Sequence, residues 1–172
     1  MRYTLLVAAL AATTAAATPA FAQQASATAE ARGVVLSPLT LTKVTDLDFG
    51  TVAAGTATGT VSINPDTGIR TITTGANMPT LVPSSFSRAR FDGLAQGATT
   101  VLLTLVPPTG NLLYSGANSI AVSNMSFDSA GPSRAVPAGG SFTAYVGADF
   151  TIAANQPNGT YSALFQVTAE YQ

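Results

Sequence analysis

Short runs of alternating or β-branched residues, separated by turn residues, dominate the chain after residue 22. That region lacks the apolar repeat of an amphipathic helix, whereas Pro, Gly and Asn recur between the runs, as turns require. The runs predict strands over residues 34–42, 58–64, 69–74, 86–91, 99–106, 120–127, 141–152 and 160–171. Seven or eight short strands at this spacing predict an all-β fold, an antiparallel immunoglobulin-like β-sandwich over residues 37–172.

Two of these runs carry more specific information. Residues 99–106 are apolar on both faces, so we expect that strand to lie centrally against a neighbouring layer. Arg88 and Arg90 are two positions apart and therefore share one face of a strand. We interpret that face as solvated, in preference to a ligand-binding role for the arginines.

The last run alternates more regularly than any other. Its odd positions are apolar or aromatic, and its even positions are polar except at Leu164, which is typical of a strand with one buried face. Gly159 is the fourteenth residue from the end and Tyr171 is the penultimate one. The residues that define the pattern are Gly159, Tyr161, Ala163, Phe165, Val167, Ala169 and Tyr171.

This C-terminal strand resembles that of subunits exported by the chaperone–usher pathway, which typically carry that glycine and a penultimate aromatic. The resemblance implies that the strand flanks an acceptor groove and is held by a periplasmic chaperone before assembly. The alternative interpretation is an ordinary core strand.

Residues 23–36 form a second alternating segment, with small apolar residues on one side of an extended chain at Ala25, Ala27, Ala29, Ala31, Gly33 and Val35. In chaperone–usher subunits such an extension enters the groove of the next subunit and completes its sandwich by β-augmentation. Two features depart from those subunits: alanine buries little area, and the chain has no cysteine. A flexible tail leading into a first strand at Val34 is the alternative.

The first 22 residues have the layout of a secretory signal peptide. Arg2 precedes an apolar stretch over residues 5–17, and small residues at Ala20 and Ala22 mark a cleavage site. We therefore expect export to the periplasm and then to the cell surface or medium. A membrane anchor is the alternative, but the stretch is short and no stop-transfer charges follow it.

Composition narrows the possible chemistry. The 172 residues include no Cys and no His, so His-dependent triads and the usual zinc, iron–sulfur and copper ligand sets are excluded. A formal charge of −1 offers no basic field for nucleic acid. Asp46 and Asp48 share one face of an extended segment, but a calcium loop starting at Asp46 would need Glu where Ala57 stands. We interpret them as turn-forming residues and expect no catalytic residue, metal or cofactor; a hydrolase using both carboxylates is a third hypothesis.

The stretch over residues 39–52, together with the ending over residues 154–162, resembles an uncharacterised family of exported bacterial β-domains, a domain of unknown function. The resemblance implies an exported sandwich related to pilus and adhesin subunits. We therefore expect a non-enzymatic fibre subunit whose partners are copies of itself or related subunits, a periplasmic chaperone and an outer-membrane usher. A self-contained binding module, with loops 79–85 or 110–116 contacting a ligand, is the alternative.

Overall fold

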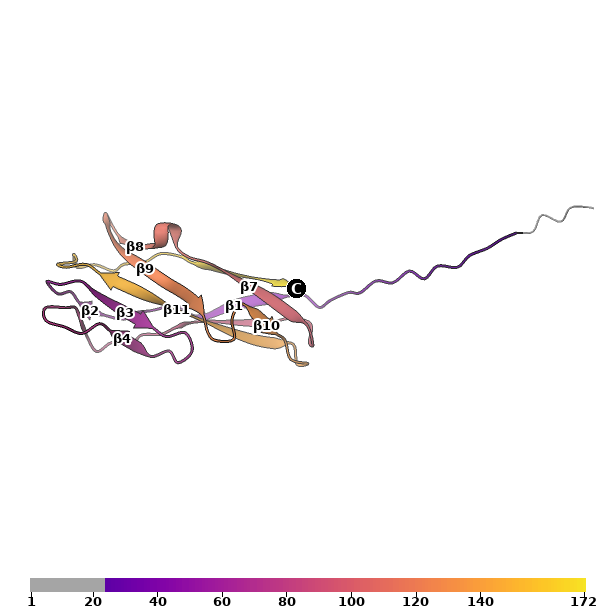
Figure 1. The fold of residues 1–172 in the computed structure, drawn as a ribbon, viewed down its shortest axis with the longest axis horizontal. Helices are drawn as coiled ribbons and strands as arrows, with labels where there is room; N and C mark the ends of the chain where they lie inside the picture. Colours follow the sequence, from indigo (N-terminus) through magenta and orange to yellow (C-terminus); the bar gives the residue numbers. More distant parts are fainter. Residues whose placement is uncertain (1–23) are drawn as a thin grey trace, which may run out of the picture. The chain divides into compact units, whose positions relative to one another are not determined.

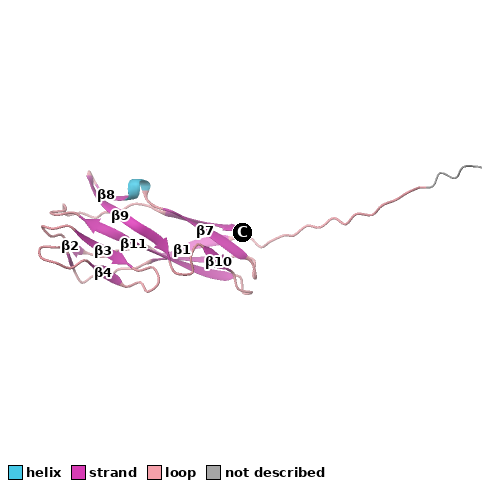
Figure 2. Ribbon diagram, in the orientation of Figure 1, coloured by secondary structure: helices cyan, strands magenta, loops and turns pink. Residues whose placement is uncertain are grey.

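A computed structural model describes residues 24–172, and the predicted leader lies outside these described residues. The described part is built almost entirely from β-strands, with one short 3₁₀ turn, η1 (Thr109–Asn111) (Figure 2). The strands are β1 (Thr40–Thr45), β2 (Val52–Ala53), β3 (Gly59–Ile63), β4 (Arg70–Ile72), β5 (Thr80–Leu81), β6 (Ala89–Leu94), β7 (Thr100–Val106), β8 (Leu112–Ser115), β9 (Asn118–Phe127), β10 (Ser133–Ala135), β11 (Ser141–Ile152) and β12 (Gln166–Tyr171). The predicted all-β class is confirmed.

The strand pairs of residues 24–172 are all antiparallel and form three sheets (Figure 1). The largest sheet has the order β1-β6-β11-β3-β4, with β9 on the other edge of β11 and β8 beside β9. A three-stranded sheet has the order β10-β7-β12, and β2 pairs with β5. The central position predicted for residues 99–106 is confirmed, because β7 has a neighbour on each side.

The long strand β11 organises the largest sheet. Its first half, up to Val146, pairs with β6, and its second half, from Ala148, pairs with β3 on the same edge. Gly147 lies between the halves, where the β3–β4 turn crosses closely: an added Cβ would lie 2.2 Å from the carbonyl oxygen of Ile63. Glycine is therefore required here by close backbone approach.

The core lies between the layers and continues along β11. At one end, Val101 and Leu103 of β7 pack with Phe142 and Ala144 of β11. At the other end, the buried side chains of β3, β9 and the second half of β11 pack together. A third group, built on Ala89, Phe91 and Val146, lies in the middle strands β6 and β11. The arrangement is an antiparallel, sandwich-like fold with a curled main sheet.

The strand boundaries differ from prediction at both ends of the domain. The first strand begins at Thr40, not at residue 34, because Pro38 has no N–H for a sheet ladder. The last strand begins at Gln166, not at residue 160, because Gln166 pairs with Val106, the final residue of β7, and two prolines follow Val106. The strand predicted over 86–91 lies three residues later, over Ala89–Leu94.

Candidate functional site

The C-terminal strand β12 is an edge strand. It pairs with β7 on one side, and no strand of residues 24–172 pairs with its other side. Gln172, the residue after β12, donates its N–H to the carbonyl of Thr100, the first residue of β7, at 3.1 Å. Because ladder hydrogen bonds alternate between the two sides of an antiparallel strand, the N–H groups of Val167, Ala169 and Tyr171 point to the free edge.

The predicted alternation of the C-terminal strand is confirmed over residues 161–171. Every odd side chain is partly buried, and every even side chain, including that of Leu164, is exposed. None of the odd side chains is fully buried, although those from Phe165 onward pack on the core: the Phe165 ring meets the Phe91 ring edge-on at 6.1 Å between centroids. Val167 packs on that same middle cluster, while Ala169 and Tyr171 pack on the cluster around Val101.

The odd side chains of β12 cover the core only in part, and we call this surface the half-covered core. Its opposite border is β1. This strand pairs with β6 and has no second strand partner among the described residues. Leu39 and Leu41 are likewise only partly buried against the cluster that Tyr171 contacts. Two edge strands from different sheets therefore flank one stretch of core, and β1 and β12 contact each other.

The N-terminal half of the predicted C-terminal pattern has a local packing role. Gly159 lies so close to β8 that an added Cβ would meet the Ser115 hydroxyl oxygen at 2.3 Å. The hydroxyl of Tyr161 donates to the carbonyl of Pro157 at 2.7 Å and accepts from the side chain of Gln156 at 2.9 Å. Ala163, next along the chain, is partly buried. These contacts order the turn that leads into β12.

Residues 24–39 belong to no strand, and the side chains of residues 24–38 are exposed. The side chains of Val34 and Val35 are 88% and 94% exposed. Glu30 and Arg32 pair at 2.9 Å, which raises the pKa of Arg32. Residues two apart share a side in an extended chain, so this pair lies on the polar side and the predicted donor residues, Ala25 to Val35 in alternation, lie on the other.

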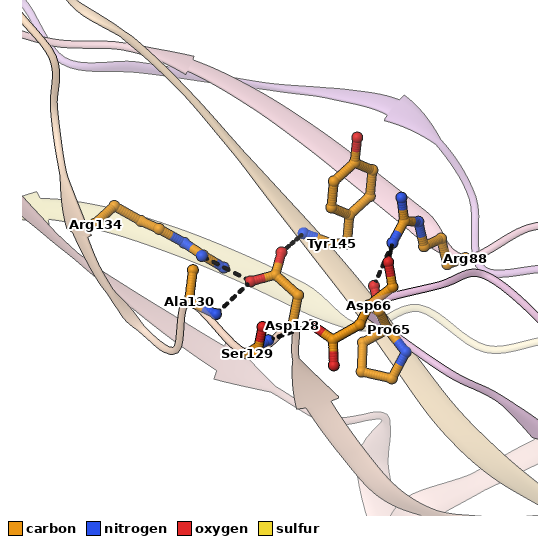
Figure 3. A network of polar contacts seen from close by, with 8 residues as sticks. All are labelled: Pro65, Asp66, Arg88, Asp128, Ser129, Ala130, Arg134 and Tyr145. Atoms are coloured by element: carbon orange, nitrogen blue, oxygen red, sulfur yellow. Dashed lines mark hydrogen bonds and ion pairs between the residues drawn. The ribbon is translucent and has the colours of Figure 1, made fainter.

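A polar network holds the β3–β4 turn against β11 (Figure 3). The Arg88 guanidinium lies 3.4 Å from the centroid of the Tyr145 ring and donates to the carbonyls of Pro65, at 2.6 Å, and of Asp66. The Asp66 carboxylate accepts the N–H of Ser129 at 2.6 Å, and this hydrogen bond lowers the pKa of Asp66. Tyr145 lies between the fully buried Ala144 and Val146 of β11, so its ring and the Arg88 that covers it lie on the outer face of the sheet.

A buried ion pair fastens the crossover from β9 to β10. Arg134 Nη1 lies 2.7 Å from Asp128 Oδ1, and the two side chains are 5% and 11% exposed. Asp128 also accepts the N–H of Ala130 and the N–H of Tyr145 (Figure 3). Sequence patterns missed this pair because Asp128 and Arg134 lie in a turn-rich stretch with no periodicity.

The remaining charged candidates have local partners. Arg90 makes two 2.9 Å hydrogen bonds to Asp92, which raise the pKa of Arg90 and lower that of Asp92. Asp48 accepts the N–H of Gly50, a turn contact, and Asp46 pairs with Lys43 at 2.6 Å. Residues 24–172 contain no group of three or more His, Cys, Asp or Glu side chains placed to share a metal ion.

Two open hollows lie on the surface, away from the predicted binding loops. One, of about 460 Å³, lies beside the β3–β4 turn and includes Asn124 and Asp149; the other, of about 430 Å³, lies beside β10 and Arg134. The predicted loops instead contain short strands, since residues 79–85 include β5 and residues 110–116 include β8. Neither range is therefore a loop throughout, and the contact of either with a ligand stays a prediction.

Comparisons with known proteins place the domain in a family. Neither the curated proteins nor the solved structures include a significant match to this chain. Among residues 24–172, no helix is long and apolar enough to span a membrane. A family model covers residues 39–171, a range that begins one residue before β1 and ends with the last residue of β12. The chain belongs to the family described as Domain of unknown function (DUF4402).

Proposed function

We propose that this chain is an exported, non-enzymatic subunit of a surface fibre, assembled by strand donation between copies. The N-terminal segment, residues 23–36, is the donor, and the free edge of β12 is the acceptor. The leader-like residues 1–22 support export to the periplasm, where a chaperone and an outer-membrane usher are the expected partners.

The observation that carries the proposal is the half-covered core beside β12. An edge strand with alternating inward side chains, none of them fully buried, is a template for one more strand. Main-chain hydrogen bonds to the free N–H groups of Val167 and Ala169 would supply affinity, and the inward side chains of the added strand would supply register.

The donor segment has complementary properties. Its described residues, 24–36, have no strand partner, and they expose Val35 on the donor side, which burial would stabilise. The alanines that precede these valines are small, which suits a surface that is already partly covered. Each CH₂ that alanine lacks relative to a bulkier side chain forfeits about 0.8 kcal/mol, so the largest apolar contribution on the donor side comes from Val35.

A head-to-tail contact of this kind repeats without closing and generates an open filament. Sedimentation of residues 23–172 should therefore show concentration-dependent multimers, whereas residues 37–172, which lack the donor segment, should not form them. Multimers of equal size from both forms would refute the role of the segment, and a stable monomer of residues 23–172 without a chaperone would refute the fibre.

The second candidate is a self-contained binding module. The hollow beside the β3–β4 turn favours it, because Asn124 donates to Asp149 at 2.6 Å and hydroxyl side chains of β3 and β4 line the same hollow. In that case residues 23–172 would be monomeric, and a ligand would shift the amide resonances of Asn124 and Asp149 and leave β12 unchanged.

A further inference from the structure

The hydroxyl of Tyr171 joins the beginning of the domain to its end. It donates to the carbonyl of Ser37 at 2.7 Å and accepts the N–H of Gln96 at 2.7 Å. The hydroxyl of Ser37 also donates to the side chain of Gln96 at 2.9 Å. The partly buried Tyr171 ring packs on the core cluster that contains Phe142. The residue from which the N-terminal segment leaves the domain is thus fastened to the last residue of β12.

Ser37 occupies the position at which the segment would have to turn to cover its own domain. Thr40 already pairs with Leu94, so a segment folding back along the free edge of β1 must reverse between Leu36 and Leu39. Ser37 precedes Pro38, which favours an extended backbone at Ser37. The hydrogen bond to Tyr171 holds the Ser37 carbonyl in place, so reversal requires that this bond break.

We propose that the Tyr171–Ser37–Gln96 contacts form a latch that disfavours closure of the segment on its own domain and leaves it available to a second copy. The inference rests on the proposed function, since residues 23–36 are the segment that covers the half-covered core, whether of their own domain or of a second copy. Tyr171 is a positioning residue here. A net hydrogen bond changes such an equilibrium by roughly fivefold, which sets the expected effect of removing the hydroxyl.

The test uses the absence of native cysteine. Thr28→Cys on the segment and Thr168→Cys on the exposed face of β12 are combined in residues 23–172 and joined by a short bifunctional maleimide. Products between copies form a ladder, whereas a product within one chain stays at monomer size. Tyr171→Phe keeps the ring and removes only the hydroxyl, and should raise the ratio of within-chain to between-copy product by roughly fivefold.

Tyr145→Phe is the matched control, because it removes the same hydroxyl from the outer face of β11, where Arg88 covers the ring. This control should leave the product ratio unchanged. Hydrogen exchange at the Gln96 amide provides a second readout that needs no assembly. It should accelerate roughly fivefold in Tyr171→Phe and not in the control, because only the former loses the acceptor of the Gln96 N–H.

The outcomes separate the latch from the fibre. If between-copy products form and the ratio of within-chain to between-copy product is the same in Tyr171→Phe as in the unsubstituted chain, the latch is overturned and the proposed function is retained. If no between-copy product forms with Tyr171 intact, the fibre is refuted; a within-chain product that then rises in Tyr171→Phe still supports the latch. Unchanged exchange at Gln96 together with an unchanged product ratio overturns the latch in either case.

Discussion

Replacing Phe165 by alanine tests whether the odd residues of the C-terminal strand face the core. The Phe165 ring is partly buried and meets the Phe91 ring edge-on. Truncating a fully buried Phe to Ala costs about 3–5 kcal/mol, and the partly buried Phe165 ring should cost the lower end of that range, about 3 kcal/mol. For a chain of this size, the change lowers Tm by about 6–12 °C.

Leu164→Ala is the matched control on the neighbouring residue. The Leu164 side chain is 93% exposed, so its truncation should change the free energy of unfolding by less than about 0.5 kcal/mol. The assay is urea denaturation of residues 23–172 with each substitution, at one protein concentration for both variants, so that any association between copies affects both alike. Equal losses for the two variants, or a larger loss for Leu164→Ala, would refute the strand register described above.

Three further substitutions test the network and the packing around β11. Gly147→Ala places a Cβ 2.2 Å from the carbonyl oxygen of Ile63 and should prevent folding or displace the β3–β4 turn; a native amide spectrum with unchanged Tm would contradict that packing. Asp128→Asn leaves Arg134 buried without its counter-charge and should cost about 3 kcal/mol in urea denaturation, and a loss below about 1 kcal/mol would argue against the buried pair. The pKa of Asp66 is lowered in the folded state, so its contribution to stability is present above its unfolded pKa and is lost as pH falls through its folded pKa. Asp66→Asn should therefore reduce the fall in the free energy of unfolding at acidic pH. An unchanged fall would contradict the stabilising role of the ionised Asp66 carboxylate.

The periodicity of the sequence was sufficient to predict those strands that cover the core and are long enough to show a pattern. The strands β7, β9 and β11 follow from their sequence runs, and the exposure of residues 161–171 follows from alternation alone. The ends of the strands were harder to predict from the sequence, because they depend on where the partner strand ends. Residues 160–165 carry the pattern of β12, yet they lie beyond Val106, where prolines end the partner strand.

The polar contacts could not be predicted because they join residues far apart in the chain. Asp66 meets Ser129, and Tyr171 meets Ser37 and Gln96, only once the sheets are assembled. Short strands such as β2 and β5, of two residues each, are stabilised by their position in the fold and leave no sequence period. The sequence identified Tyr171 as part of the alternating pattern. Its hydrogen bonds could not be predicted, because they form only where residues 37 and 96 come close to the end of β12 in the fold.

The central claim, that β12 accepts the N-terminal segment of another copy, is tested most directly by adding a peptide of residues 24–36 to residues 37–172 and measuring amide exchange. The account predicts that the N–H groups of Val167 and Ala169, on the free edge, become protected, while those of Thr168 and Glu170 are already protected by β7. No added protection at Val167 and Ala169 with saturating peptide, or protection confined to another edge such as β4, would contradict it.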